Sequence, residues 1–413
     1  MRVQAAAVRR PRPRTLGIVC MCIVLLVAGA VAGVRWAQSW KGSVTVLANW
    51  SGGEREQFEK AIEQFEENHR IDVIYQGSSA LSQVLAADLA AGTQPDVAVL
   101  PEPGELMAYA AEGRLRPLDG LFEAGDYDRV WMPKVAGEDG RKRTYWLPVK
   151  TGLKSMVWHS GSLPRNEIAE IAGEPDTWCL GMESGATSGW PGTDWVEDIL
   201  LQQAGPKVYE KWATGDLEWT DKRVRKAWTT WGEMAGAGDG ARAERVLKAN
   251  YGQDCSHQRL EHQGSFRDTA WKEADGDFLH SAEVIPEAQQ NSQHWEVSGD
   301  LAAMLNATDE AKELIRYLAD PGIELPDFTA NKKAASPDSY DDPMKRKIGS
   351  ILRDPKQQRC WDASDTMPPA MRNAFHEAVL HFLVSPEELD NQLELLESLR
   401  NDQGPAFPVC GSG

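Results

Sequence analysis

The chain has 413 residues, which is too many for one compact core and predicts two domains. The formal net charge of −18 argues against a nucleic-acid surface, because such a surface needs clustered Lys and Arg to neutralise phosphates. Tryptophan is unusually frequent, with 16 residues against 8 tyrosines and 9 phenylalanines, and this excess favours a site where flat rings stack on a ligand.

The N-terminus predicts export. Four arginines at positions 9 to 14 precede an uncharged apolar run, Leu16–Val34, as in a signal peptide or a signal anchor whose basic side stays in the cytoplasm. The run is just long enough to span a bilayer. Ala30-Val-Ala32 offers a cleavage site, so removal and retention both stay open. Cys20 stands in a poor context for a lipoprotein cysteine, and no lipidation is expected.

Four cysteines lie beyond the apolar run: Cys179, Cys255, Cys360 and Cys410. An even number of cysteines in an oxidising compartment predicts disulfides. Four cysteines permit three pairings, and the count alone does not choose among them. No C-x-x-C or clustered His spacing supports a metal site, and no metal or cofactor is expected.

Strands and helices alternate in the first part of the chain and predict a parallel α/β lobe. Ser51-Gly-Gly-Glu54 fits a capping box, which predicts where the first helix begins. The expected strands are 44–49, 71–75 and 96–100, and the expected helices follow them at about 51–66, 79–92 and 105–112.

Ligands bind beyond the carboxyl ends of the strands in such a sheet. The residues that follow the three strands are therefore candidates for ligand contact, although helix capping alone explains the residue type at Ser51, Glu54 and Ser79. These candidates are Trp50 and Glu54, Ser78 and Ser79, and Pro101 and Glu102.

The second part of the chain begins with an extended crossing segment, Tyr145–Trp158. An acidic amphipathic helix is expected at Trp195–Gln203, and residues 206–250 are expected to be largely helical. The Gly-rich break at 236–240 lacks the Lys-Ser/Thr of a phosphate loop and predicts a turn. Further helices are expected at 311–318, at 371–383, and after Ser385, which opens a second capping box.

The stretch Trp178–Trp195 combines three tryptophans, two carboxylates and four hydroxyl residues with several glycines. Aromatic faces with a few polar groups suit an uncharged, hydroxylated ligand. The alternative is a surface loop whose tryptophans are core anchors.

These features together resemble the extracellular solute-binding proteins of sugar-type ABC importers, in the periplasmic-binding-protein superfamily, and most closely the alpha-glucoside or oligosaccharide binders. The resemblance rests on seven stretches: 44–50, 94–104, 150–158, 178–195, 262–266, 299–300 and 361–368. It implies an α/β fold of two lobes joined by a hinge (the type II fold), preceded by one N-terminal membrane or signal helix in residues 1–43. Lobe 1 is expected at 44–150 and about 301–350, and lobe 2 at 151–300 and about 351–413.

The resemblance also implies a sugar site. Trp190 would give a stacking face, whereas Trp178 and Trp195 would anchor the stretch. Carboxylates would accept hydrogen bonds from sugar hydroxyls, and Lys154 and Gln263 would donate. Together with the order of the segments, it favours the disulfides Cys179–Cys255 and Cys360–Cys410. The implied ligand residues are Trp50, Glu54, Ser79, Pro103, Lys154, Glu183, Trp190, Asp194, Gln263, Gly299 and Asp300.

The implied function is a non-enzymatic, monomeric receptor that binds a carbohydrate outside the membrane and delivers it to an ABC permease with a separate ATPase. A sugar sensor that signals to a membrane partner is one alternative. An exported glycoside hydrolase is the other, because carboxylates such as Glu183 and Asp194 could act as acid and base. The motifs G-x-S-x-G and H-E-x-x-H, which would indicate serine or metal hydrolases, are absent from the sequence.

Overall fold

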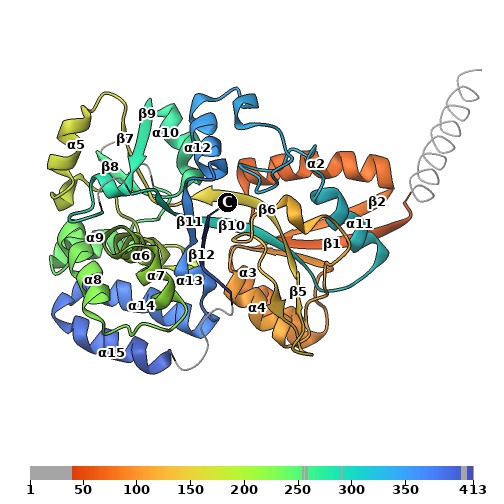
Figure 1. The fold of residues 1–413 in the computed structure, drawn as a ribbon, viewed down its shortest axis with the longest axis horizontal. Helices are drawn as coiled ribbons and strands as arrows, with labels where there is room; N and C mark the ends of the chain where they lie inside the picture. Colours follow the sequence, from red (N-terminus) through yellow and green to blue (C-terminus); the bar gives the residue numbers. More distant parts are fainter. Residues whose placement is uncertain (1–39, 254, 256–258, 290–291, 401–406, 413) are drawn as a thin grey trace, which may run out of the picture.

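The computed structural model describes residues 40–412, apart from 254, 256–258, 290–291 and 401–406. The predicted signal or anchor segment falls almost wholly outside these residues. Across the described part of the chain, no helix has the length and apolar character needed to cross a membrane. Two groups of helices lie on either side of strands that run between them, and the two lobes stand side by side (Figure 1).

The first lobe alternates strand and helix as predicted. Strand β1 pairs in parallel with β2 and β3, and the residues of β3 are all buried. Helix α2 turns a row of apolar residues that includes Phe58 and Phe65 toward this sheet. The elements are β1 (Gly42–Ala48), α2 (Gly52–His69), β2 (Ile71–Gly77), α3 (Leu81–Ala91), β3 (Val97–Leu100), α4 (Pro103–Ala111) and α11 (Asp309–Leu318).

Two antiparallel strands, β6 (Trp146–Leu153) and β10 (His294–Met304), connect the lobes. The first half of β10 pairs in parallel with β11 (Gln358–Trp361), and its last residues pair with β3. Strand β12 (Cys410–Ser412) closes the edge beside β11. One sheet of seven strands therefore extends through both lobes, and the pairing sets Asp300 opposite Lys150 at an irregularity in β10.

The second lobe is mostly helical around a small sheet, in which β7 (Met156–Ser160) lies between β8 (Leu260–His262) and β9 (Gly276–His280). Helix α6 packs against α7, α8 and α14. The helices are α5 (Arg165–Ile171), α6 (Trp190–Ala204), α7 (Pro206–Ala213), α8 (Lys222–Ala235), α9 (Gly240–Lys248), α10 (Asp268–Glu273), α12 (Pro343–Arg353), α13 (Ala363–Thr366), α14 (Pro369–Val384) and α15 (Leu389–Leu399). A short hairpin, β4 (Val135–Ala136) and β5 (Lys142–Arg143), lies beside the first lobe.

The expected amphipathic helix at Trp195–Gln203 is wrong in character. It belongs to α6, in which almost every residue is buried. Its acidic residues are inside because each has partners there: Glu197 accepts the backbone N–H of Ala363, and Asp198 binds His262 Nε2 at 2.7 Å. The sequence pattern predicted that these carboxylates face solvent, but they are hydrogen-bonded within the core.

Both predicted capping boxes are also wrong. The helices form, but neither Ser51 nor Ser385 makes a side-chain capping hydrogen bond. The Glu54 carboxylate pairs with the ammonium of Lys150, a charged partner that competes well with a backbone N–H. Ser385 precedes a short 3₁₀ turn, and α15 begins only at Leu389.

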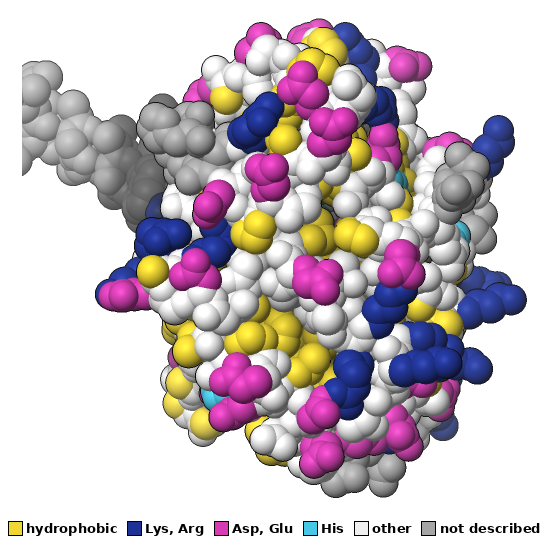
Figure 2. All heavy atoms as spheres, turned by 90° about the vertical axis from the view of Figure 1, so that its left-hand side faces the viewer, with side chains coloured by type: hydrophobic (Ala, Val, Ile, Leu, Met, Phe, Trp, Pro, Cys, Tyr) yellow, Lys and Arg dark blue, Asp and Glu magenta, His cyan; other side chains and the backbone are white. Residues whose placement is uncertain are grey.

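Both disulfides favoured from the sequence, Cys179–Cys255 and Cys360–Cys410, are present. Trp178 and Trp195 are buried and pack edge to face with ring centroids 4.6 Å apart, as expected of anchors. Figure 2 shows the face at the end of the second lobe, where acidic and basic side chains are interspersed around one apolar area.

The lobes meet closely at the start of α4. A Cβ atom on Gly104 would lie 2.2 Å from the carbonyl oxygen of Met367 and 2.4 Å from that of Thr366. Only glycine permits this approach of α4 to the turn between α13 and α14. Arg372 of α14 adds ion pairs with Glu102 at 3.4 Å and with Glu105 at 3.2 Å.

Candidate functional site

Three of the predicted residues, Trp50, Glu54 and Asp300, lie around Lys150 on β6, together with Asp327. We name these five residues the Lys150 cluster. The Lys150 ammonium pairs with Glu54, lies 3.0 Å from Asp327 and lies 3.7 Å from Asp300. Trp50 Nε1 donates to the Asp300 carboxylate at 2.6 Å. The cluster therefore draws residues from β6, β10, the start of α2 and the loop before α12 to one point.

Burial and charge act in opposite directions in the Lys150 cluster. Burial disfavours the ammonium, but the carboxylates of Asp300, Asp327 and Glu54 outweigh it and raise the pKa of Lys150. Burial raises the pKa of Glu54 despite the neighbouring ammonium. One cation faces three carboxylates, so the cluster carries an excess of negative charge.

A second group surrounds Lys154, in the short link between β6 and β7, and we name it the Lys154 cluster: Lys154, Asp194, Asp362, Glu197 and Glu296. The ammonium lies 2.9 Å from Asp194 of α6 and 2.5 Å from Asp362, which follows β11. Backbone N–H groups of Ala363 and Ser364 donate to Glu197. All five side chains of the cluster are buried.

Only one carboxylate of the Lys154 cluster is held clearly ionised. Burial opposes its charge, but the Lys154 ammonium outweighs burial and lowers the pKa of Asp362. Burial raises the pKa of Asp194, Glu197 and Glu296 well above its usual range, and the charge of Asp362 adds to the effect. A single ammonium compensates one carboxylate, and the others are stabilised in their protonated form.

Oxygens of Asp194, Glu296 and Asp362 lie within 4.8 Å of one another, an arrangement compatible with a metal ion. The Lys154 ammonium already bonds two of these three carboxylates, so it supplies the positive charge that a metal would bring. The residues at this point fit a lysine-centred cluster better than a metal centre.

In the described part of the chain, buried side-chain oxygens of Asp194 and Glu296 in the Lys154 cluster, and Oε1 of Gln263 just after β8, have no hydrogen-bond partner. A buried acceptor without a donor costs about 1 to 3 kcal/mol. Trp190 is only partly buried, and its ring lies 5.2 Å from the Lys154 ammonium. A partly exposed aromatic ring thus lies next to a cluster with unpartnered polar oxygens, and a hydroxylated ligand can satisfy these because each hydroxyl both donates and accepts.

Four other predicted residues, Gly299, Pro103, Ser79 and Glu183, lie outside the two clusters. Gly299 lies on β10, where a Cβ would come 2.8 Å from the Lys150 carbonyl oxygen. Pro103 is buried at the first turn of α4. Ser79 is exposed, and no hydrogen bond or ion pair joins it to either cluster within the described chain. Glu183 is exposed and bonds Asn250 Nδ2 at 2.9 Å and the backbone N–H of Gly185 at 3.0 Å.

Beside Pro103, Glu102 has a more marked environment. Burial raises its pKa to about 7 even though Arg372 opposes the shift, and its Oε2 has no hydrogen-bond partner among the described residues. Glu102 was one of the strand-following candidates in the sequence. It offers a third acceptor, on the first lobe.

Several site residues were missing from the sequence-based set. Lys150 and Asp327 complete one cluster, and Asp362, Glu197 and Glu296 complete the other. Lys150 and Asp362 lie within the stretches that carry the family resemblance, which was the available signal. Nothing in the sequence marks Asp327, because its partner is far away in the chain and its own surroundings are an irregular loop.

Known proteins resemble this chain over most of its length. The family model for the bacterial extracellular solute-binding protein matches residues 49–335. The osmoprotective compounds-binding protein GgtB of Synechocystis is 30% identical over 386 residues, covering 84% of this chain and 90% of that relative. The alpha-glucosides-binding periplasmic protein AglE of Rhizobium meliloti is 27% identical over 401 residues, with 84% and 85% covered.

A solved structure of a chitin oligosaccharide binding protein superposes with a TM-score of 0.68 at 16% identity, covering 88% of this chain and 99% of that one. Its likeness confirms the two-lobe α/β fold. The family match includes both cluster lysines, Lys150 and Lys154, whereas Asp362 lies beyond its last residue. The chain therefore belongs to the family of bacterial extracellular solute-binding proteins.

Proposed function

We propose that this solute-binding protein captures a carbohydrate between its two lobes and delivers it to an ABC permease that works with a separate ATPase. The observation that carries the proposal is the partly exposed ring of Trp190, which lies 5.2 Å from the Lys154 ammonium, together with the unpartnered buried oxygens of Asp194 and Gln263. A sugar offers hydroxyl donors for the acceptors and C–H faces for the ring.

The charge of the site narrows the ligand class. The buried oxygens Glu102 Oε2, Asp194 Oδ1 and Gln263 Oε1 have no partner among the described residues, and both lysines are already engaged by carboxylates. An anionic ligand would meet surplus carboxylates at close range and bind poorly. An uncharged saccharide fits this balance. The names of AglE and GgtB support alpha-glucosides and osmoprotective compounds as the first candidates.

Access to the site requires the lobes to separate, because most of the proposed contacts are buried. Trp50, Lys154, Asp194 and Gln263 are each less than one-tenth exposed. A cavity of about 60 Å³ in the second lobe, lined in part by Trp212 and Trp219, includes none of them. We infer that the structure represents a closed form and that β6 and β10 carry the hinge.

The proposal includes a place and a mode of attachment. The family is extracellular, and the basic and apolar N-terminus would either hold the receptor at the outer face of the membrane or be removed during export. We propose a monomer that acts by binding alone. Incubation with glycosides and product analysis test this against a hydrolase, since a receptor returns the sugar unchanged.

The decisive experiment compares two tryptophans. Binding of mono-, di- and oligosaccharides is first found by thermal shift, because a ligand that binds the native state raises its stability. We then expect Trp190→Ala to weaken the best saccharide by at least about tenfold with a small change in melting temperature. The matched control is Trp178→Ala, in which loss of a buried ring should cost about 3 to 5 kcal/mol of stability.

Each result has a clear meaning. If Trp190→Ala loses melting temperature as Trp178→Ala does, and keeps its affinity per folded molecule, Trp190 is a core residue. If no uncharged saccharide stabilises the wild-type protein, the carbohydrate proposal is wrong, and the thermal-shift screen then continues with cationic solutes.

A further inference from the structure

Three aromatic rings gather beside the Lys154 cluster. The ring centroids of Trp190 and Tyr251 lie 5.1 Å apart, those of Trp190 and Phe266 lie 6.1 Å apart, and those of Tyr251 and Phe266 lie 6.5 Å apart. Each pair is steeply tilted, in the edge-to-face manner that aromatic rings favour. The three rings come from three separate segments: the start of α6, the loop after α9, and the turn after β8.

These rings differ from the core aromatics. Core rings such as Trp158 and Trp231 are fully buried, whereas Trp190 and Tyr251 are partly exposed and Phe266 is 37% exposed. An exposed phenylalanine gains little for folding, because much of its apolar surface stays in water. The arrangement therefore leaves parts of three neighbouring aromatic rings open to solvent.

The loop that carries Tyr251 is fastened to the stretch before α6. Glu183 bonds Asn250 Nδ2 through its carboxylate and accepts the Tyr251 N–H at its backbone oxygen, at 2.9 and 3.1 Å. Gln253 Nε2 donates to the Leu180 carbonyl at 2.8 Å. The Glu183 carboxylate is thus used within the protein, and its effect on a ligand acts through the position of the loop.

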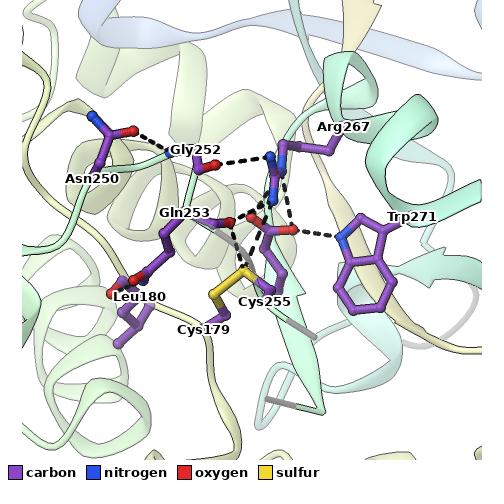
Figure 3. Close-up of a disulfide and its surroundings, with 9 residues drawn as sticks. Cys179, Leu180, Asn250, Gly252, Gln253, Cys255, Arg267 and Trp271 are labelled. Carbon is purple, nitrogen blue, oxygen red and sulfur yellow. Dashed lines mark hydrogen bonds and ion pairs between the residues drawn. A yellow bond between two sulfur atoms is a disulfide. The ribbon is translucent and has the colours of Figure 1, made fainter. Parts of the chain in front are cut away.

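A second set of bonds fastens the same loop from the other side. The disulfide Cys179–Cys255 joins the loop to the stretch before α6, and the Arg267 guanidinium extends over it toward Gln253 and Gly252 (Figure 3). Arg267 donates to the Gln253 carbonyl at 3.0 Å and pairs with Glu261 at 3.0 Å. Because Arg267 directly follows Phe266, the same contacts fix two of the three rings.

We propose that Trp190, Tyr251 and Phe266 form one aromatic platform that selects saccharides of two or more rings, and that Glu183 and the Cys179–Cys255 disulfide position Tyr251 in it. The inference rests on the proposed carbohydrate function. Trp190 with the acceptors of Asp194 and Gln263 holds one sugar ring, and Tyr251 and Phe266 extend the stacking surface to the next.

The test uses glucose, maltose and maltotriose as probes on the full chain. We expect Tyr251→Ala and Phe266→Ala each to weaken maltotriose by about tenfold and glucose by less than about threefold, since a lost stacking ring affects only the sugar that it covers. Calorimetric titration gives the affinities, and a thermal melt of each variant checks that it is folded.

The positioning roles of Glu183 and of the Cys179–Cys255 disulfide are tested by the ratio of the maltotriose affinity to the glucose affinity. A purely structural role would leave this ratio unchanged. We expect Glu183→Gln, and the pair Cys179→Ser with Cys255→Ser, to lower this ratio by about three- to tenfold, because Tyr251 would no longer be held against Trp190. The matched control is Cys360→Ser with Cys410→Ser, which removes the disulfide between β11 and β12 and should leave the ratio as in the wild type.

Two outcomes overturn the proposal. If glucose and maltotriose weaken equally in Tyr251→Ala and Phe266→Ala, or if neither weakens, the rings only pack against each other. If both double cysteine variants change the ratio alike, the loop disulfide has no positioning role. Wild-type protein that binds none of the three sugars contradicts the carbohydrate assignment instead, so the two failures are distinguishable.

Discussion

The crossing segment carries two lysines, Lys150 and Lys154, that bind carboxylates in different ways. Lys150 joins four segments of the chain at a partly exposed point, and the side chain of its partner Glu54 is 37% exposed. Lys154 lies among buried carboxyl groups, and its partner Asp362 is 1% exposed. An ion pair that water can reach contributes little, whereas a buried one is costly to break.

Under the proposed function, the two clusters have different roles in one binding site. The Lys154 cluster joins α6, the residue after β11 and the crossing segment, and α6 also carries Trp190 and the unpartnered Oδ1 of Asp194. The Lys150 cluster links the first lobe to the hinge, with surplus acceptors near Trp50. A buried Lys154 cluster that changes little and a more exposed Lys150 cluster that can exchange partners would suit a receptor that closes on its ligand.

The largest expected effect separates the lysines by stability. Lys154→Met would leave the ionised carboxylate of Asp362 without a cation in a dry environment, and should destabilise the protein by about 3 to 5 kcal/mol. Lys150→Met should cost about 1 to 2 kcal/mol, between the values for exposed and buried pairs. Urea unfolding of both variants at pH 7 measures the difference. Equal losses of stability in the two variants would mean that the two clusters contribute equally to the stability of the fold.

The general fold could be predicted from the sequence because its signals are local. The strands and helices between 42 and 111 follow hydrophobic patterns within short windows, and so does α11, with Leu314 and Leu318 on its buried face. The character of α6 could not be predicted in this way. Glu197 and Asp198 look like a solvent-facing stripe, and only partners distant in the chain, such as Ala363, explain why they are buried.

The candidate site shows the same limit. The resemblance to a family pointed to Lys154 and Asp194, and the structure brings them together. It did not supply Asp362, which is 208 residues from Lys154 in the chain. Glu183 was expected among the ligand residues, but its carboxylate bonds Asn250 and Gly185, a pairing that depends on how the loop after α9 folds back.

An intermediate effect concerns pH. Burial raises the pKa of Glu296 above its usual range, so the folded state holds a proton that the unfolded state releases at a lower pH. Such a group stabilises the fold fully below its unfolded pKa, and its contribution falls by about 1.4 kcal/mol per pH unit as the pH rises toward the folded pKa. The contribution of Glu296 to stability should therefore decline as the pH rises above the unfolded pKa of about 4.5.

The variant that isolates this effect is Glu296→Gln, since both carboxylate oxygens of Glu296 are without partners among the described residues and an amide resembles the protonated acid. We expect it to match the wild type at pH 5 and to exceed it at pH 8. Glu244→Gln, which alters an exposed pair with Lys248, should leave the pH dependence unchanged. A difference in stability between Glu296→Gln and the wild type that stays constant from pH 5 to pH 8 would contradict the raised pKa of Glu296.

The smallest expected effect on stability concerns the Lys150 cluster. Glu54→Gln removes one of three carboxylates around Lys150, and the ammonium keeps Asp327 at 3.0 Å and Asp300 at 3.7 Å. The free energy of unfolding should change by less than about 0.5 kcal/mol, since the pair is partly exposed and screened. Calorimetric titration then decides whether Glu54 touches the sugar. A clear loss of affinity at unchanged stability places Glu54 among the ligand contacts. A loss of stability comparable to that of Lys150→Met would mean instead that Glu54 is a structural residue, and that the Lys150 cluster stabilises the fold as the Lys154 cluster does.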